Sequence, residues 1–147
     1  MKLSTRGRYG VRALLELSMH LGEGPVSLKD IARNQEISLQ YLEHLITPLL
    51  AGGLIKSTRG AKGGISLAKA PGDIRLADII QLLEGSTAPV DCVDKPDLCN
   101  RSGTCATRDI WTDVKDAIND VLETITLEDL LKRQKRKLQS EEIMYYI

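Results

Sequence analysis

Phenylalanine is absent from this 147-residue chain, and aromatic residues make up only 3% of it. Leu, Ile, Val and Ala must therefore build the core, and a hydrophobic content of 42% is sufficient for one. The chain has no apolar run long enough to span a membrane, and Met1–Arg6 lacks the apolar region of a signal peptide. We therefore expect a protein of the cytoplasm that makes no contact with a membrane.

Cysteine is scarce as well: the chain has three, and all lie between Cys92 and Cys105. The odd count and the lack of an export signal argue against a disulfide framework, so the thiols are available for metal or redox chemistry. The chain has no Cys-x2-Cys pair, no catalytic Cys–His neighbour and no nucleotide-binding fingerprint. We therefore expect neither an enzyme nor a small-molecule substrate.

Neither charge is in excess over the whole chain, which has 20 Lys and Arg against 20 Asp and Glu. The two halves differ, however. Residues 1–75 carry eleven basic and six acidic side chains, whereas residues 76–147 carry nine basic and fourteen acidic ones. A basic first half favours an anionic partner such as double-stranded DNA.

Apolar residues recur at helical spacing in six stretches, at 5–21, 27–33, 38–51, 76–84, 106–125 and 127–131. Ser27 and Ser38 have the character of N-caps. Two strand-like runs, 54–58 and 64–69, flank a glycine-containing turn. This order predicts a mainly α fold with a small β-hairpin wing, which is a winged helix-turn-helix followed by a long helix.

The helix after Ser38 has the length of a DNA-reading helix, because an α-helix fits the major groove while the preceding helix braces it. Ser38 and Tyr41 suit phosphate contacts. Gln40 suits the edge of adenine, and Glu43 suits the amine of cytosine. His44 completes the outward face that we expect to meet DNA.

The predicted hairpin turn holds Arg59 and Lys62 beside Gly60. An arginine on a narrow, glycine-permitted turn suits insertion into a minor groove, where the potential is most negative. Four further basic residues are expected to contact phosphates, namely Lys2, Arg6, Arg8 and Arg12.

The cysteines follow the pattern Cys92-x6-Cys99-x5-Cys105. Three thiolates on one loop suit a soft or borderline metal, but the gaps are longer than those of zinc knuckles. An iron–sulfur cluster tolerates wider gaps and usually has four protein ligands. A fourth ligand other than cysteine, or an open position, is therefore required.

Four stretches carry a resemblance to a known family: Met1–Tyr9, Ile37–Leu45, Gly53–Gly64 and the three cysteines. Over residues 1 to about 134 the chain resembles the winged-helix iron–sulfur regulators typified by IscR, which also include NsrR and CymR. The resemblance implies a 2Fe–2S cluster on Cys92, Cys99 and Cys105, and regulation of cluster-biogenesis genes. It also implies that Glu43 discriminates between operators.

The same resemblance implies a homodimer whose long helices cross, and hence a palindromic operator. The long helix carries an apolar stripe that requires burial and that we assign to dimerisation: Ile110, Trp111, Val114, Ile118, Val121, Leu122 and Ile125. We expect residues 1–86 to form the DNA-binding domain, 87–106 the cluster loop, 107–134 the dimerisation region and 135–147 a mobile tail.

This chain departs from the family at the fourth cluster ligand. The family histidine, three residues after the last cysteine, is here Arg108, and the acidic residue used by NsrR is here Arg8. Arginine keeps its proton and does not ligate metals. Oxygen donors from Asp91, Asp94, Asp97 or Asp109, a water or a small thiol are the alternatives. Two further hypotheses stay open, a nitric-oxide, redox or zinc switch of the same fold and a small electron carrier.

Overall fold

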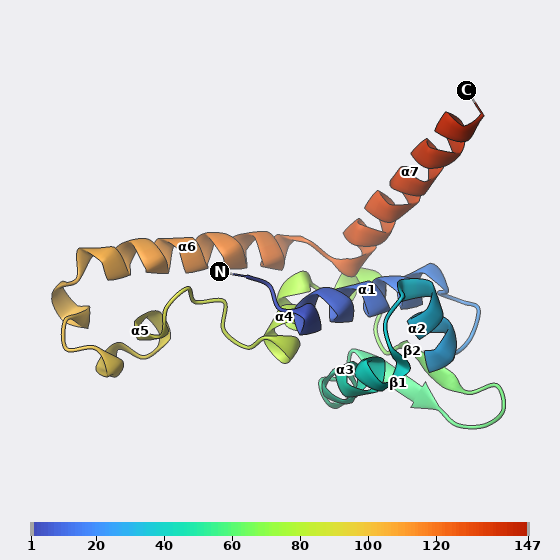
Figure 1. Cartoon of the computed structure of the whole chain (residues 1–147), viewed down its shortest axis with the longest axis horizontal. Coiled ribbons are helices and arrows are strands. Elements are labelled where there is room, and N and C mark those ends of the chain that lie inside the picture. The colour runs from blue at the N-terminus through green and yellow to red at the C-terminus, as the bar shows by residue number, and fades with distance from the viewer. Residues whose placement is uncertain (1, 147) are drawn as a thin grey trace.

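The protein is described by a computed structural model over residues 2–146, and it is mainly helical. The helices are α1 (Thr5–Met19), α2 (Leu28–Gln35), α3 (Leu39–Ala51), α4 (Leu76–Leu83), α5 (Asp91–Asp94), α6 (Ala106–Thr124) and α7 (Leu127–Tyr145). One antiparallel hairpin joins β1 (Ile55–Thr58) to β2 (Gly64–Leu67). Short 3₁₀ turns lie at Pro71–Asp73, Pro96–Leu98 and Ser102–Thr104. The predicted fold class is confirmed (Figure 1).

Serine side chains begin the first three helices. The hydroxyl oxygens of Ser4, Ser27 and Ser38 each accept a hydrogen bond of 3.2 Å from the amide three residues further on. Each bond satisfies one of the amides that a helix N-terminus leaves free. The caps predicted at Ser27 and Ser38 are confirmed. Between α2 and α3, Glu36 has a φ of 54°, and this left-handed residue makes the tight turn of the helix pair.

The hydrophobic core lies between α1, α2, α3, α4 and the hairpin. It consists of aliphatic side chains, as the lack of phenylalanine requires. Its fully buried members are Leu14, Ile31, Leu42, Leu45, Leu49, Leu54, Ile74, Ile79 and Leu127. Leu127 comes from α7, so the start of the last helix is fixed to the N-terminal part of the chain.

The hairpin is attached to the helices by a bridge between Val26 and Ile65, whose amides and carbonyls exchange hydrogen bonds of 2.9 Å. Gly64 makes this approach possible, because a Cβ there would lie 2.2 Å from the Val26 carbonyl oxygen. The base of the hairpin is therefore held in place next to the start of α2.

The long helix α6 extends away from this core, and α7 projects from the core in another direction (Figure 1). The Leu76 amide donates to the Ile125 carbonyl at 2.9 Å, and the Leu127 amide donates to that of Ile74 at 2.8 Å. These two bonds anchor the α6–α7 junction. None of the helices between residues 2 and 146 has the length and apolar character that a membrane crossing needs.

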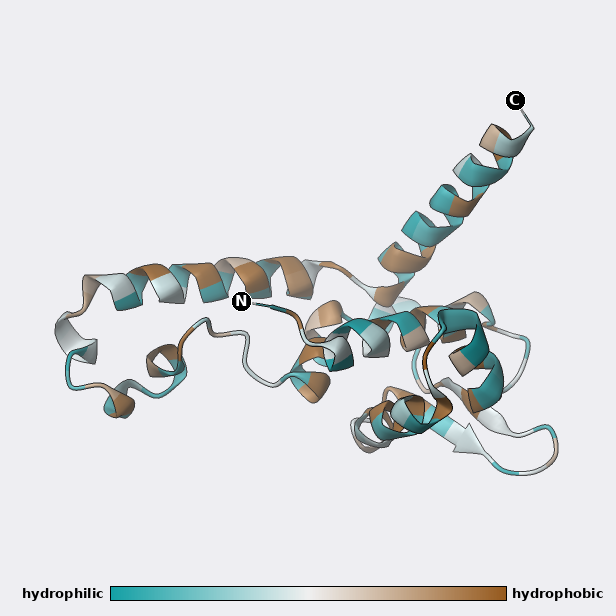
Figure 2. Cartoon of the chain, viewed as in Figure 1, coloured by the Kyte–Doolittle hydropathy of each residue, from teal (hydrophilic) through white to brown (hydrophobic). Residues whose placement is uncertain are grey.

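The C-terminal segment differs from its prediction. We expected a short helix at 127–131 and a mobile tail from residue 135, but α7 continues to Tyr145. Figure 2 shows this helix as mostly hydrophilic. Its Lys, Arg, Gln, Leu and Glu residues are strong helix formers, so propensity sustains a helix that has no regular apolar stripe to announce it.

Candidate DNA-binding surface and cysteine segment

The outer face of α3 is polar and free. Leu42, Leu45, Ile46 and Leu49 turn inward, whereas Ser38, Gln40, Glu43 and His44 are exposed. Within residues 2–146 the carboxylate of Glu43 takes part in no ion pair and no side-chain hydrogen bond. Gln40, Glu43 and His44 therefore share one accessible helix face, and their side chains are available to base edges. The hydroxyl oxygen of Ser38 accepts from the Tyr41 amide at the start of the helix.

Tyr41 differs from its neighbours on α3 because it is half-buried. Its ring meets that of Tyr9 edge to face, with centroids 5.9 Å apart and an interplanar angle of 87°. This aromatic pair joins α3 to α1. Only part of the Tyr41 side chain is left for DNA, and its phosphate contact stays a prediction.

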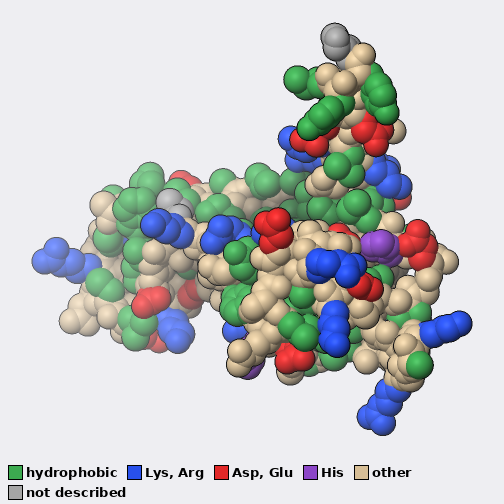
Figure 3. All heavy atoms as spheres, turned by 45° about the vertical axis from the view of Figure 1, so that its right-hand side comes forward, with side chains coloured by type: hydrophobic (Ala, Val, Ile, Leu, Met, Phe, Trp, Pro, Cys, Tyr) green, Lys and Arg blue, Asp and Glu red, His purple; other side chains and the backbone are tan. Residues whose placement is uncertain are grey.

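The tip of the hairpin carries Arg59 and Lys62, both exposed. Gly60 has a φ of 114°, which favours glycine, and its carbonyl accepts a 3.0 Å hydrogen bond from the Gly63 amide. Basic side chains project outward at the lower right of Figure 3, on the side where Figure 1 places the β1–β2 loop. The wing thus presents two cations on a narrow turn, as predicted.

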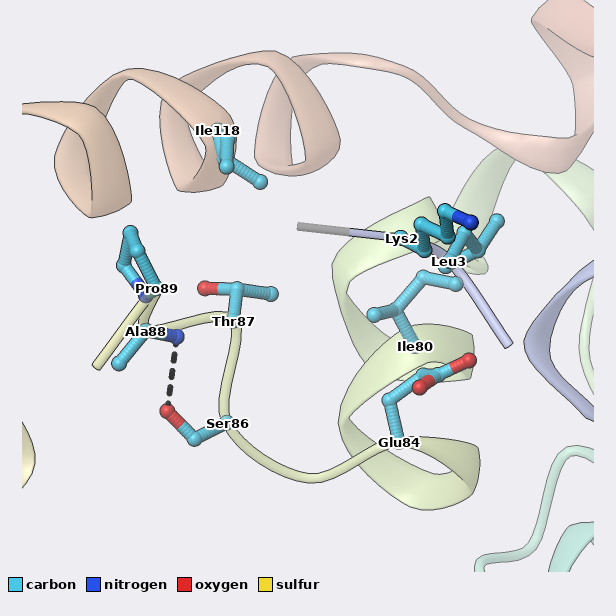
Figure 4. Close-up of a pocket in the computed structure, with 9 residues that line it drawn as sticks. All are labelled: Lys2, Leu3, Ile80, Glu84, Ser86, Thr87, Ala88, Pro89 and Ile118. Carbon is cyan, nitrogen blue, oxygen red and sulfur yellow. Dashed lines mark hydrogen bonds between the residues drawn. The ribbon is translucent and has the colours of Figure 1, made fainter. Parts of the chain in front are cut away.

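The N-terminal cations do not form one group. Lys2 lines a cavity of about 320 Å³ that is bounded by Glu84 at the C-terminal end of α4, the connection 86–89 and Ile118 of α6 (Figure 4). Arg6 and Arg8 are exposed on the first turns of α1, where Arg8 Nη2 donates to Thr5 Oγ1 at 3.2 Å. The phosphate contacts of Lys2, Arg6 and Arg8 stay predictions.

A polar cluster between α1 and the end of α2 was missed by the sequence reasoning. Glu16 is only 5% exposed, and its carboxylate accepts hydrogen bonds of 2.7 Å from both Asn34 Nδ2 and Gln35 Nε2. Arg12, which was expected to contact phosphate, is half-buried and instead donates to the side chain and the carbonyl of Gln35. The sequence signal for this cluster was Glu16, a single acid on the apolar face of α1. The hydrogen bonds of the cluster fix the position of α2 against α1.

The three cysteines occupy different environments on the segment between α4 and α6. Cys92 lies in α5 and Cys105 caps α6, both half-buried, while Cys99 is exposed after the second 3₁₀ turn. The Thr107 hydroxyl, 3.1 Å from Cys105 Sγ, and the Arg108 backbone lower the pKa of the Cys105 thiol. Within residues 2–146 no three His, Cys, Asp or Glu side chains are placed to hold a metal ion. Three thiols are donors that an iron–sulfur cluster takes, and among the described residues these three do not converge on one point.

Arg108, at the position of the family histidine, serves another purpose. Its Nε donates to the Cys92 carbonyl at 2.9 Å, and its Nη2 lies 3.5 Å from the Val93 carbonyl. Farther along α6, Lys115 Nζ lies 2.6 Å from Asp94 Oδ1 and Asn119 accepts a 2.6 Å hydrogen bond from Thr87. Hydrogen bonds from Lys115 and then Ser86 lower the pKa of Asp94. These contacts fasten residues 87–94 along α6.

A separate face of α6 is apolar and uncovered. No residue of this 19-residue helix is buried, and Ile110, Trp111 and Val121 are exposed. Val114, Ile118, Leu122 and Ile125 are half-buried along the same stripe. The predicted stripe is present on the helix (Figure 2), and its role in dimerisation stays a prediction.

Comparisons with known proteins bear on this arrangement. The sequence model of the family described as "Rrf2: Iron-dependent Transcriptional regulator" matches residues 3–133. The protein named rrf2 of Nitratidesulfovibrio vulgaris is 48% identical over 132 residues, which cover 90% of this chain and 88% of that protein. Among solved structures, CymR, the global cysteine regulator of Bacillus subtilis, has a TM-score of 0.77 at 43% identity and covers 90% of this chain and 98% of that one. IscR of T. potens has a TM-score of 0.76 at 46% identity and covers 91% and 88%.

Proposed function

This chain belongs to the Rrf2 family of transcriptional regulators, and on that premise we propose that it is a homodimeric DNA-binding regulator whose cysteine segment senses iron–sulfur status. The observation that carries the DNA-binding part is the exposed polar face of α3, a helix that lies at the same end of the molecule as the hairpin wing (Figure 1). Such a regulator acts where the chromosome is, in the cytoplasm.

DNA recognition would use two elements. The α3 helix enters the major groove, where Gln40 and Glu43 meet base edges and Ser38 meets the backbone. The wing carries Arg59 and Lys62 to the neighbouring minor groove. In a homodimer joined through α6, two such units face two half-sites, so the operator is palindromic.

The sensing group is the set of Cys92, Cys99 and Cys105. The identity to IscR of T. potens supports a 2Fe–2S cluster as the group they hold and cluster-biogenesis genes as targets. The residues described here supply three thiols and no fourth ligand at Arg108.

A second candidate is favoured by the separation of the sulfurs and by the likeness to CymR. In this reading the thiols themselves respond to oxidants or to small thiols, and the regulator serves cysteine metabolism. Both candidates share the DNA-binding surface and differ only in what the cysteine segment carries.

Anaerobic purification of the full chain separates the two. A cluster gives visible absorption and two iron and two sulfide per protomer. If the purified protein is colourless and cannot be reconstituted with iron and sulfide, the cluster proposal is excluded and the thiol-based candidate remains.

DNA binding is tested by selecting duplexes from a random pool with the full chain, then measuring affinity for the recovered sequence. We expect a palindromic site, with Cys92→Ala altering affinity relative to the anaerobic native protein. Failure to enrich any sequence would remove the DNA-binding proposal.

A further inference from the structure

The polar side chains on α6 that face the cysteine segment form one line. Arg108, Lys115 and Asn119 are separated by seven and four residues, which places them on one side of an α-helix. This side differs from the apolar stripe that contains Val114 and Val121. The three side chains reach the backbone of Cys92, the carboxylate of Asp94 and the hydroxyl of Thr87.

We propose that Arg108 is a positioning residue for the cysteine segment, and that it holds Cys92 beside the start of α6 before anything binds the thiols. The inference rests on the proposed sensing role of this segment. Arg108 lies one helical turn after Cys105, so a guanidinium bonded to the Cys92 carbonyl ties the residue that carries one thiol to the helix that begins after Cys105.

The chemistry of the side chain fits this task. Guanidinium presents several N–H donors in a rigid plane and keeps its charge, so it can hold two successive carbonyls at once. A hydrogen bond from a charged donor is stronger than one from a neutral donor. An imidazole at this place could donate only through its ring nitrogens. Arg108 therefore replaces a ligand with a fixed support for the backbone that carries Cys92.

The rest of the segment has no such support. The Lys95 amide bonds to Asp91 at 2.9 Å, and beyond it every backbone hydrogen bond described for residues 96–104 stays within 95–104. No side-chain hydrogen bond is described for that stretch, and Cys99 is exposed. The consequence is an asymmetric site, in which Cys92 and Cys105 are held in place and Cys99 is free to approach whatever they bind.

Hydrogen exchange of the reduced, metal-free full chain without DNA tests the support. The reporters are the Val93 amide, bonded to Val90 at 3.3 Å, and the Lys95 amide. Arg108→Ala is expected to raise their exchange about tenfold, because a charged hydrogen bond is lost. Arg101→Ala, which removes an exposed arginine from the same segment, is expected to leave them unchanged.

A cross-linking experiment separates positioning from simple stabilisation. A short bismaleimide should bridge Cys92 to Cys105 in the native protein and in Arg101→Ala, whereas Arg108→Ala should shift several-fold toward bridges that include Cys99. Arg108→Lys, which keeps the charge but not the planar fork, should fall between them. If Arg108→Ala does not fold, Arg108→Lys carries the same two measurements.

Unchanged exchange at Val93 and Lys95, or an unchanged ratio of bridges in folded Arg108→Ala, would overturn the positioning role. Neither measurement contains a cluster or an operator. A negative result therefore counts against Arg108 alone, and a colourless protein or a failed DNA selection counts against the proposed function.

Discussion

Glu16 is a buried carboxylate on α1 whose partners lie at the end of α2. Replacing it with alanine leaves the amide donors of Asn34 and Gln35 without their acceptor. We expect Glu16→Ala to lower the free energy of unfolding by about 2 kcal/mol, the cost of leaving buried polar groups unpaired. Urea denaturation followed by circular dichroism measures this loss. Glu123→Ala, at an exposed carboxylate of α6 outside this cluster, is the control and should change stability by less than about 0.5 kcal/mol.

His20 extends the same cluster and makes it sensitive to pH. Its hydrogen bonds with Glu23 and then Glu16 raise the pKa of His20 above its ordinary value of 6.5. Burial alone would raise the pKa of Glu16, but hydrogen bonds from Asn34 and Gln35 more than offset it and lower that pKa from 4.5.

The signs of these two shifts define where the cluster stabilises the fold. A raised histidine pKa contributes stability that is complete below pH 6.5 and is lost as pH rises through the folded value. A lowered glutamate pKa contributes stability above pH 4.5 that is lost as pH falls through the folded value. We therefore expect the urea midpoint of the native protein to decline above pH 6.5, and that of His20→Gln to decline less. Parallel curves for the two proteins would contradict this assignment.

Among the elements, the wing is the simplest to test. Arg59→Ala removes a cation from a tip that the glycine turn aims outward, and we expect operator affinity to fall about tenfold, or 1.4 kcal/mol. The slope of log affinity against log salt should shrink by about 1, because one fewer counterion is released. Fluorescence anisotropy over a salt series measures both quantities. Lys69→Ala, an exposed cation that follows β2, is the matched control. An equal loss of operator affinity in Lys69→Ala would show that Arg59 contributes only general positive charge and makes no specific contact from the wing.

The elements also show what a sequence pattern can and cannot predict. The five helices α1 to α4 and α6 were predictable because apolar residues recur every three to four positions along them, and the strands because glycines mark the turn between them. The four-residue helix α5 and the 3₁₀ turns beside it are too short to show a period. The end of α7 has helix-forming residues without an apolar stripe, so the pattern predicted a tail there.

The same limit applies to the candidate site. The clustering of Cys92, Cys99 and Cys105 in the sequence identified the segment, but spacing along a loop does not determine where sulfurs lie. The contact of Arg108 with the Cys92 carbonyl depends on how the whole segment folds back along α6. The spacing of Arg108, Lys115 and Asn119 could have predicted this contact, because a line of polar residues beside an apolar stripe indicates that the helix has a second contact face.

At the scale of the whole molecule, the basic and acidic halves of the sequence correspond to two different surfaces, the candidate DNA-binding surface and the long helix α6. The basic first half includes the α3 face and the wing, and the acidic second half includes α6. Acidic residues of α6 lie on the side away from its apolar stripe: Asp109, Asp113, Asp116, Asp120 and Glu123. The acids and the line of Arg108, Lys115 and Asn119 together cover about half of the circumference of α6, and the apolar stripe occupies the rest. The stripe is therefore the face of α6 that can pack against a second protein surface.

That uncovered stripe leads to the prediction about assembly. If two copies pack through α6, Val121 becomes buried, although it is 56% exposed in a single chain. Val121→Lys then places an unpaired ammonium in an apolar interface, and we expect the dimer to weaken by about 3 kcal/mol, a hundredfold or more in its dissociation constant. Sedimentation velocity over a concentration series measures this change. Operator affinity should fall with it, because the two half-sites are no longer read together.

Glu123→Lys is the matched control for this change, since it introduces the same side chain on the opposite side of α6. It should leave the dissociation constant of the dimer near that of the native chain. A Val121→Lys protein that remains a dimer of native strength would show that the copies meet elsewhere. The stripe would then need another partner, because Ile110, Trp111 and Val121 stay exposed in the single chain.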